Sequence, residues 1–256
     1  MPRAKLEEVD RYILARYADT ARRILRAYED YDYGTISQAL NAFTTVDLSS
    51  FYADVSKDRL YTFAARSAER RSAQTAMYLM ADGLTRLMAP ILSFTADELW
   101  RFLPAEGREE SVHIAVFPKA ADLEALADPG LTDRWHRLIA LREQVVAQIE
   151  PLRKNKQIGS SLQAKVIVSA TPAELALFEP YARQLPMLFI VSEVELRPAP
   201  PDVEAHAEAR PHVTIERAGG VKCERCWRYV PAVSTDPDLA GLCDRCQDAI
   251  AETIHG

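Results

Sequence analysis

Cys223-Glu-Arg-Cys226, followed later by Cys243-Asp-Arg-Cys246, is the stretch that decides how the C-terminal part of this 256-residue sequence folds. Two residues separate the thiols in each half, so one tight turn can direct both sulfur atoms to a single point. Four thiolates complete a closed tetrahedral zinc site and leave no open position for catalysis. The spacing therefore predicts one structural zinc ion, with Cys223, Cys226, Cys243 and Cys246 as its ligands.

Two disulfides are the alternative for these four cysteines. Disulfides persist in oxidising compartments, and residues 1–8 lack the apolar core of a signal peptide. No apolar run reaches the roughly 18–20 residues of a transmembrane helix. We therefore expect a cytoplasmic protein without a membrane span. Its net charge of −6 argues against non-specific coating of nucleic acid, although a local basic face remains compatible with that total.

Apolar residues recur at helical spacing in the N-terminal half. Steps of three and four residues predict helices over residues 6–31, 33–52 and 70–92, the last ended or kinked by Pro90. Thr95-Ala-Asp-Glu98 has the sequence of a capping box and predicts a fourth, short helix. Residues 113–117 are typical of a short extended segment. The four helices predict an antiparallel bundle over residues 1–130.

The pattern changes in the second half. A fifth helix is predicted from about residue 132, with a kink at Pro151. A strand over 164–169, a helix over 172–185 capped by Thr171, and one or two strands over 188–197 make a small α+β module within residues 131–200. Residues 201–256 hold the zinc finger. Before the finger, the sequence predicts a Pro/Ala/Glu-rich linker over 198–211 and a strand over 212–216. At the end of the finger it predicts a helix over 244–254. The predicted fold class is mainly α: a bundle, an α+β module and a zinc knuckle.

The sequence contains no recognisable catalytic centre. Gly-x-Ser-x-Gly, Gly-x-Gly-x-x-Gly and the P-loop pattern do not occur, and the five histidines are scattered. The residues therefore predict a binding module, with no catalytic residues in this chain.

Basic residues near the zinc knuckle and in two other places are candidates for RNA binding. Cations can meet phosphates, and an aromatic face can stack on a splayed base. Trp227 could instead pack over the zinc site, and each cation could be a solvated side chain. The candidates are Lys57, Arg59, Arg70, Arg71, Arg153, Lys154, Lys156, Lys222, Arg225, Trp227, Arg228 and Arg245.

Residues 41–61, Asn-Ala-Phe-Thr-Thr-Val-Asp-Leu-Ser-Ser-Phe-Tyr-Ala-Asp-Val-Ser-Lys-Asp-Arg-Leu-Tyr, resemble the helical anticodon-binding domain of bacterial isoleucyl-tRNA synthetases. Residues 70–75, 87–100, 141–145 and 158–165 continue the resemblance in order. The bundle alone is also similar to the valyl and leucyl enzymes. The four-cysteine knuckle with Trp227 is similar to the C-terminal zinc finger of the isoleucyl type.

The resemblance implies the C-terminal portion of such a synthetase, as a fragment, a split gene product or a truncated paralogue. The His-Ile-Gly-His and Lys-Met-Ser-Lys-Ser signatures do not occur in the sequence. The implied partners are tRNA(Ile) and the missing N-terminal catalytic and editing domains, in a monomer. ATP would be used only by the complete enzyme and not bound by this chain. The alternatives are a zinc-finger DNA-binding or DNA-repair module, and a regulatory or assembly subunit without an RNA role.

Overall fold

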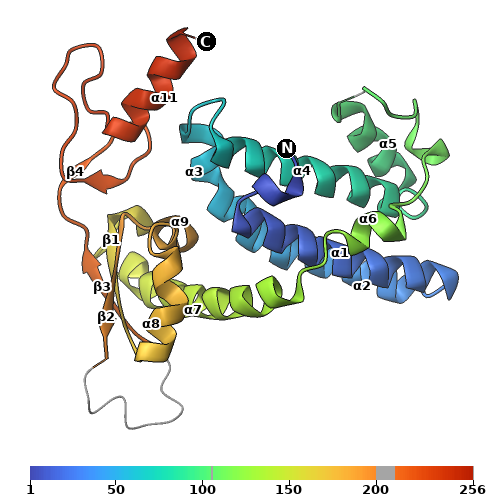
Figure 1. Cartoon of the computed structure of the whole chain (residues 1–256), viewed down its shortest axis with the longest axis horizontal. Coiled ribbons are helices and arrows are strands. Elements are labelled where there is room, and N and C mark those ends of the chain that lie inside the picture. Colours follow the sequence, from blue (N-terminus) through green and yellow to red (C-terminus); the bar gives the residue numbers. More distant parts are fainter. Residues whose placement is uncertain (105, 200–210, 256) are drawn as a thin grey trace. The chain divides into compact units, whose positions relative to one another are not determined.

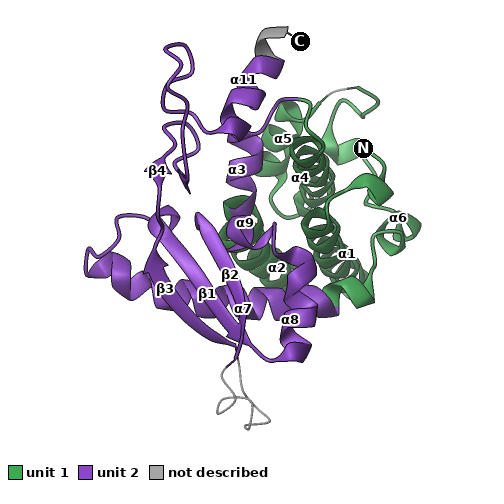
Figure 2. Cartoon of the chain, turned by 60° about the vertical axis from the view of Figure 1, so that its left-hand side comes forward, with its two compact units in different colours: residues 1–54, 66–132 green, residues 55–65, 133–256 purple. Residues whose placement is uncertain are grey.

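A computed structural model describes residues 1–104, 106–199 and 211–255, the last three without their side chains. The chain divides into two compact units, one of residues 1–54 and 66–132 and the other of residues 55–65 and 133–256 (Figure 2). Helices predominate, and the predicted mainly-α fold class is confirmed. The boundaries predicted at residues 130 and 200 remain predictions.

The first unit is a helical bundle, shown in Figure 1. Helix α1 packs against α2 and α4, and α4 packs against α5. The elements of this unit are η1 (Arg3–Lys5), α1 (Glu8–Glu29), α2 (Tyr33–Ala42), the π-helix η2 (Phe43–Ala53), α4 (Ala68–Met88), α5 (Ser93–Phe102), η3 (Val112–Ile114) and α6 (Ala120–Glu124).

Helix α1 buries one long stripe of its surface in the bundle. Val9, Ile13, Tyr17 and Ile24 are at most 3% exposed, and their spacing is that of one helix face. Gly83 on α4 makes room for this stripe, because a Cβ atom there would lie 1.7 Å from the hydroxyl oxygen of Tyr17. The close approach of α1 and α4 therefore depends on a glycine inside a helix.

The second predicted helix is longer than expected. It begins at Tyr33, where the side chain of Asp32 accepts a hydrogen bond from the Thr35 backbone N–H at 3.0 Å. It then continues through η2 into α3 (Asp54–Thr62), about ten residues beyond the predicted end. Residues 41–61 thus form one continuous helical run of α, π and α geometry.

Two predictions within the bundle region are wrong. Thr95 does not cap a helix, because α5 already begins at Ser93 and Thr95 lies inside it. The segment predicted as extended at residues 113–117 begins with the 3₁₀ turn η3. Both differences follow from packing, since Ala96 and Trp100 of α5 are buried in one cluster with Val112 of η3. The predicted end near Pro90 is confirmed, with α4 ending at Met88.

The second unit contains a three-stranded sheet covered by short helices. The strand order is β2-β1-β3, with β1 parallel to β2 and antiparallel to β3. Helices α8 and α9 lie against the sheet. The elements are α7 (Pro129–Lys154, in this unit from residue 133), η4 (Ser161–Gln163), β1 (Ala164–Ala170), α8 (Pro172–Phe178), η5 (Glu179–Tyr181), α9 (Leu185–Phe189), β2 (Glu193–Pro198) and β3 (His212–Arg217).

The predicted order of this module is confirmed, although its boundaries change. Thr171 and Glu174 form a capping box at the start of α8. The predicted helix over 172–185 is divided into α8, η5 and α9, and the strand predicted from residue 188 begins only at Glu193. Ile190 ends α9 in the left-handed region, with φ of 57°. Most of the predicted linker, residues 200–210, lies outside the described residues.

Helix α7 packs against the α+β module through its apolar face. Leu138, Leu141 and Val145 are at most 1% exposed. The guanidinium of Arg142 donates to the carbonyl of Leu188 at 3.0 Å, which ties α7 to α9. Pro151, where a kink was predicted, lies inside the helix, which continues to Lys154. Among the residues that the structure describes, no helix is both long and apolar enough to cross a membrane.

Gly83→Ala should lower the free energy of unfolding of the first unit. The added methyl group meets the phenol of buried Tyr17, and overpacking of this kind costs about 1–3 kcal/mol. Urea unfolding followed by tryptophan fluorescence measures the change, in a chain where Trp135 and Trp227 are replaced by Phe so that the signal comes from Trp100. Gly219→Ala is the control, because no atom lies within 4 Å of that Cβ position. An equal effect of both variants would contradict the packing argument.

Candidate metal centre and nucleic-acid interface

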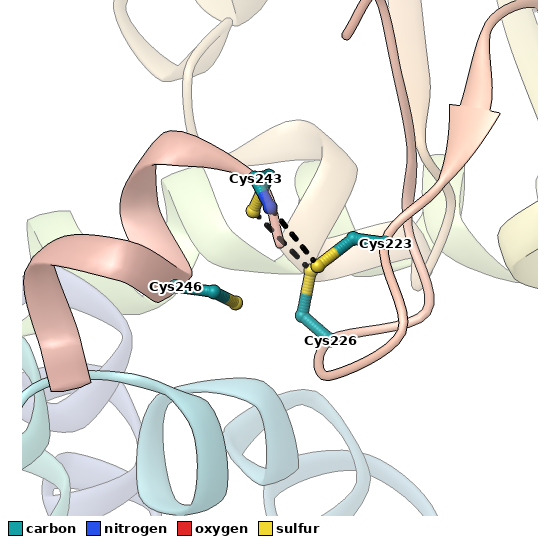
Figure 3. Close-up of side chains that lie close together, drawn as sticks. All are labelled: Cys223, Cys226, Cys243 and Cys246. Carbon is teal, nitrogen blue, oxygen red and sulfur yellow. Dashed lines mark hydrogen bonds between the residues drawn. The ribbon is translucent and has the colours of Figure 1, made fainter. Parts of the chain in front are cut away.

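The four cysteines come together from two short structural elements (Figure 3). Cys223 and Cys226 lie in the turn between β4 (Val221–Lys222) and β5 (Tyr229–Val230), whereas Cys243 and Cys246 lie at the start of α11 (Asp244–His255). The Trp227 N–H donates to the Cys223 carbonyl at 2.9 Å, and the Cys223 N–H donates to the Arg228 carbonyl at 2.8 Å. These bonds close the first turn around its two sulfur atoms.

The sulfur positions fit a tetrahedral zinc ion. All four Sγ atoms lie within 4.8 Å of one another, and those of Cys226 and Cys243 are 3.8 Å apart. A Zn–S bond of about 2.3 Å gives a tetrahedral edge of about 3.8 Å. None of the four cysteines is in a disulfide, and each is at most 8% exposed. The donor set and its spacing therefore suit a closed structural zinc site.

Hydrogen bonds prepare one of these thiols for metal binding. Burial raises the pKa of Cys223, but the backbone N–H groups of Cys226, Cys243 and Arg225 outweigh it and lower that pKa to about 6. Burial raises the pKa of Cys243 to about 12. Because thiolates are the ligands, zinc binding must release protons and strengthen as the pH rises.

Gly220 enters the knuckle in a conformation that only glycine adopts readily. Its φ is +87°, and a Cβ atom would lie 2.1 Å from the carbonyl oxygen of Val230. The β4–β5 pair closes across this position. Gly220 thus has a steric role in this turn that a residue with a Cβ atom could not fill.

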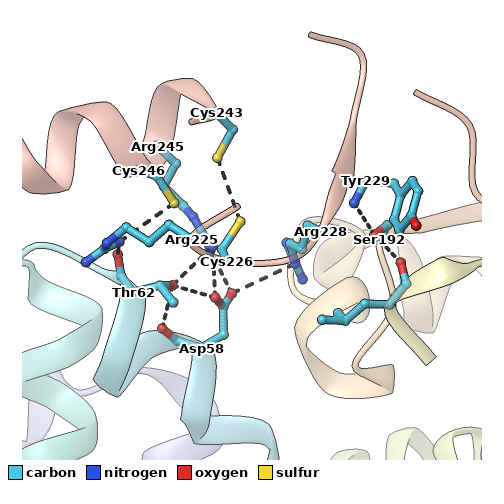
Figure 4. A network of polar contacts seen from close by, with 11 residues as sticks. Asp58, Thr62, Ser192, Arg225, Cys226, Arg228, Tyr229, Cys243, Arg245 and Cys246 are labelled. Atoms are coloured by element: carbon cyan, nitrogen blue, oxygen red, sulfur yellow. Dashed lines mark hydrogen bonds and ion pairs between the residues drawn. The ribbon is translucent and has the colours of Figure 1, made fainter. Parts of the chain in front are cut away.

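A half-buried acid on α3 holds the zinc finger, as Figure 4 shows. The two carboxylate oxygens of Asp58 accept hydrogen bonds from Arg245 at 2.6 and 2.8 Å, and Arg228 lies 3.9 Å from the same carboxylate. Arg245 also donates to the Thr62 hydroxyl at 3.2 Å, and Arg225 donates to the Thr62 carbonyl. We call these five residues the Asp58 network.

The Asp58 network shifts the titration of its central acid. Burial raises the pKa of Asp58, but the hydrogen bonds and charge of Arg245, with Thr62 and Arg228 adding less, outweigh it. They hold that pKa below its ordinary value of 3.8. A two-pronged contact between a guanidinium and a carboxylate is geometrically specific, so the network fixes α11 against α3.

A second set of hydrogen bonds joins the zinc finger to the α+β module. The Tyr229 N–H donates to the Ser192 hydroxyl at 2.7 Å, and that hydroxyl donates to the Leu162 carbonyl at 2.6 Å (Figure 4). The Gln163 amide donates to the Tyr229 hydroxyl at 3.3 Å. The finger is therefore attached at two places within the second unit.

The predicted RNA-binding cations differ in exposure and in their contacts with the chain itself. Arg225, Arg228 and Arg245 contact groups of the chain itself through the Asp58 network, and Arg59 is 2% exposed with a bond to Ser56. Arg70 is half-buried, and the Arg153 guanidinium pairs with Glu150 at 2.7 Å. The exposed cations are Lys57, Arg71, Arg153, Lys154, Lys156 and Lys222.

Trp227 faces solvent. Its side chain is 60% exposed, its φ is 62°, and the Lys222 ammonium lies 5.5 Å from the ring centroid. Packing over the zinc site would bury the ring, so this exposure favours the alternative in which the ring remains available for stacking. Lys222 and Trp227 together present a cation beside an aromatic face.

Sequence reasoning missed the two α3 residues that matter most for the finger. Asp58 lies between the predicted Lys57 and Arg59, Thr62 follows one helical turn later, and Asp58 is 187 residues from Arg245. The only available signal was an acid between Lys57 and Arg59, a pattern that is also common on solvated helices.

Comparison with known proteins now defines the family. Residues 10–168 match the family described as the anticodon-binding domain of tRNA ligase. The chain belongs to this family. Residues 220–249, which include all four cysteines, match a zinc finger found in FPG and IleRS. The match and the four-cysteine cluster together support one structural zinc ion. The larger domain does not favour the DNA-repair alternative.

Similar proteins are isoleucine–tRNA ligases. That of Syntrophotalea carbinolica is 46% identical over 94% of this chain and 26% of its own length. Those of Staphylococcus haemolyticus and Geobacter sulfurreducens are 39% and 38% identical over 99% and 98% of the chain, and 27% of their own length. The chain thus spans about a quarter of the curated relatives it matches. It corresponds to a C-terminal portion, as the resemblance implied.

Loss of one thiolate should release zinc and unfold the finger alone. Cys243→Ser should lose the metal, because the closed site depends on four ligands, and metal binding is coupled to folding. Elemental analysis and hydrogen exchange over residues 211–255 measure both effects, and the bundle should keep its helices. Cys243→His, which retains a zinc-binding group, is the control. A metal-free wild-type chain with residues 211–255 intact would refute the zinc site.

Asp58→Asn should destabilise the second unit by about 1–3 kcal/mol at neutral pH, since Arg245 loses a charged partner. The folded-state pKa of Asp58 lies below its ordinary 3.8. Its stabilisation is therefore complete above that ordinary pKa and is lost as the pH falls through the folded value. The difference from wild type should stay level from about pH 7 to about pH 5 and then shrink in stronger acid.

Urea unfolding at several pH values with saturating zinc measures this difference. Asp248→Asn is the control, because Asp248 is exposed on the same helix. Equal destabilisation by the two variants, or a difference that widens in acid, would contradict the role of the Asp58 network.

Proposed function

We propose that this chain recognises the anticodon arm of tRNA(Ile) as the C-terminal part of an isoleucine–tRNA ligase. The observation that carries the proposal is the family match over residues 10–168. The ligase names of the relatives support the choice of tRNA. Unpaired bases of an anticodon loop expose edges and faces that side chains can read.

The zinc finger would supply stacking. Trp227 is exposed beside Lys222, and the closed turn at Cys223 fixes the backbone next to it. A base stacked on the ring would place its phosphate within reach of a neighbouring cation. The metal would act on RNA only through this rigid support.

The remaining cations would meet phosphates. Lys154 and Lys156 are exposed at the end of α7, and Arg153, Lys57, Arg71 and half-buried Arg70 are further candidates. Arg225, Arg228 and Arg245 keep a bond to the protein, so a phosphate contact would have to be shared with Asp58 or Thr62. Arg59 would have to leave a buried position. We therefore place most of the phosphate contact on the lysines.

The catalytic step would take place elsewhere in the ligase. In the complete protein, ATP and isoleucine would react in the part that this chain lacks, and this chain would position the tRNA for it. We expect a cytoplasmic monomer. Binding energy at the anticodon arm is thus the contribution proposed for these residues.

The two kinds of contact can be separated by their salt dependence. Lys154→Ala with Lys156→Ala should weaken binding of tRNA(Ile) and flatten the slope of log K against log salt by about 0.7–0.9 per lost phosphate contact. Trp227→Ala should cost about 1–3 kcal/mol with little change in slope. Filter binding at several salt concentrations measures both, with zinc content checked for each variant.

The matched control is Lys5→Ala with Lys119→Ala, which removes two exposed cations outside the proposed surface. An anticodon-swapped tRNA and an unrelated tRNA test the choice of RNA. Equal affinity for all three RNAs would reduce the chain to a general RNA binder. Absence of binding to any of them, with zinc in place, would refute the proposal.

A further inference from the structure

Helix α5 is apolar on two sides, and only one of them is covered. Ala96 and Trp100 are at most 2% exposed and pack against Val112. The Trp100 ring lies beneath the Arg108 and Arg86 guanidinium groups, at 4.2 and 4.9 Å from its centroid. Its indole N–H donates to the Glu109 carbonyl at 2.9 Å. This side of α5 is fully used within the bundle.

A second apolar side faces solvent. Leu99 is 41% exposed and Phe102 is 81% exposed. At about 100° per residue these two side chains fall on one side of α5, roughly 110° from Ala96 and Trp100. We define the outer face of α5 by Leu99 and Phe102 and by three neighbours at its start, Ile91, Leu92 and Phe94, which are 39%, 47% and 94% exposed.

Such a face needs a partner. A cluster of large exposed apolar side chains marks an interaction site. RNA does not suit this site. The charges on α5 are Asp97, Glu98 and Arg101, and Arg101 already pairs with Asp97. No unpaired cation of this helix is therefore available to a phosphate.

We propose that the outer face of α5 is the docking site for the remaining part of the ligase chain. The inference rests on the proposed function. Its physical argument is that the relatives continue for about three quarters of their length beyond the matched portion, whereas the outer face is exposed in the part of this chain that the structure describes. The partner is thus an apolar protein surface of the same ligase, in cis in a full-length protein.

Thiol labelling can measure whether the face is covered. Phe102→Cys and Leu99→Cys each add one reactive thiol to a chain whose own cysteines are buried. Labelling by iodoacetamide, read by peptide mass spectrometry, is compared between this chain and a full-length chimera. In the chimera, this chain replaces the matched portion of the Syntrophotalea carbinolica ligase. Tyr31→Cys and Tyr61→Cys are controls at positions 77% and 75% exposed.

The expected result is rapid labelling of all four variants in this chain. In the chimera, labelling at residues 99 and 102 should be slower by about tenfold or more, because covered sites react only through local opening. At least one control should keep its rate. Equal rates at residues 99 and 102 in both proteins would overturn the proposal.

Two further outcomes are decisive. If the isolated chain sediments as a dimer that Phe102→Ser dissociates, the face binds a second copy and the proposal is wrong. A chimera that fails to fold by circular dichroism is replaced by one built on the Staphylococcus haemolyticus ligase, which aligns with 99% of this chain. Labelling is measured without tRNA, so failure of tRNA recognition and failure of docking are distinguishable.

Discussion

Coordination of one zinc ion by four thiolates is the constraint on which the C-terminal part of the structure depends. The core of the knuckle consists of the four cysteines with Val230, Val233 and Leu242 packed around them. So small an apolar cluster cannot offset the entropy of ordering two turns and a helix start. The metal therefore takes the place of a hydrophobic core, and Lys222 and Trp227 directly flank the first pair of its ligands in the sequence.

The Asp58 network extends that constraint to the rest of the second unit. Zinc fixes the finger internally, but it does not fix the finger to anything else. Asp58 and Thr62 connect α3 to Arg245 and Arg225, and Ser192 connects the finger to the sheet. Because α3 continues from η2, the run at residues 41–61 leads directly into the residues that hold the finger.

Much of this architecture could be predicted from the sequence because its signals are local. The Cys-x-x-Cys pairs, the capping box at Thr171 and the strand at β1 depend on neighbours a few residues apart. The Asp58 network could not be predicted, since it joins residues far apart in sequence. The start of β2 was missed for a different reason. The apolar run of residues 188–191 suits a buried strand as well as a helix end, and the left-handed Ile190 decides between them.

The network also changes how the basic residues are interpreted. From sequence, the cations around the knuckle are equivalent candidates for phosphate contact. In the structure, the arginines contact a carboxylate, a carbonyl or a cysteine sulfur of the same unit. The Lys222 ammonium instead lies over the exposed Trp227 ring. Arginine suits the first role because its planar fork matches a carboxylate, and lysine suits the second as a mobile point charge. The two residue types therefore differ in their surroundings: Asp58 pairs with arginines that support the finger, whereas Lys154, Lys156 and Lys222 are exposed.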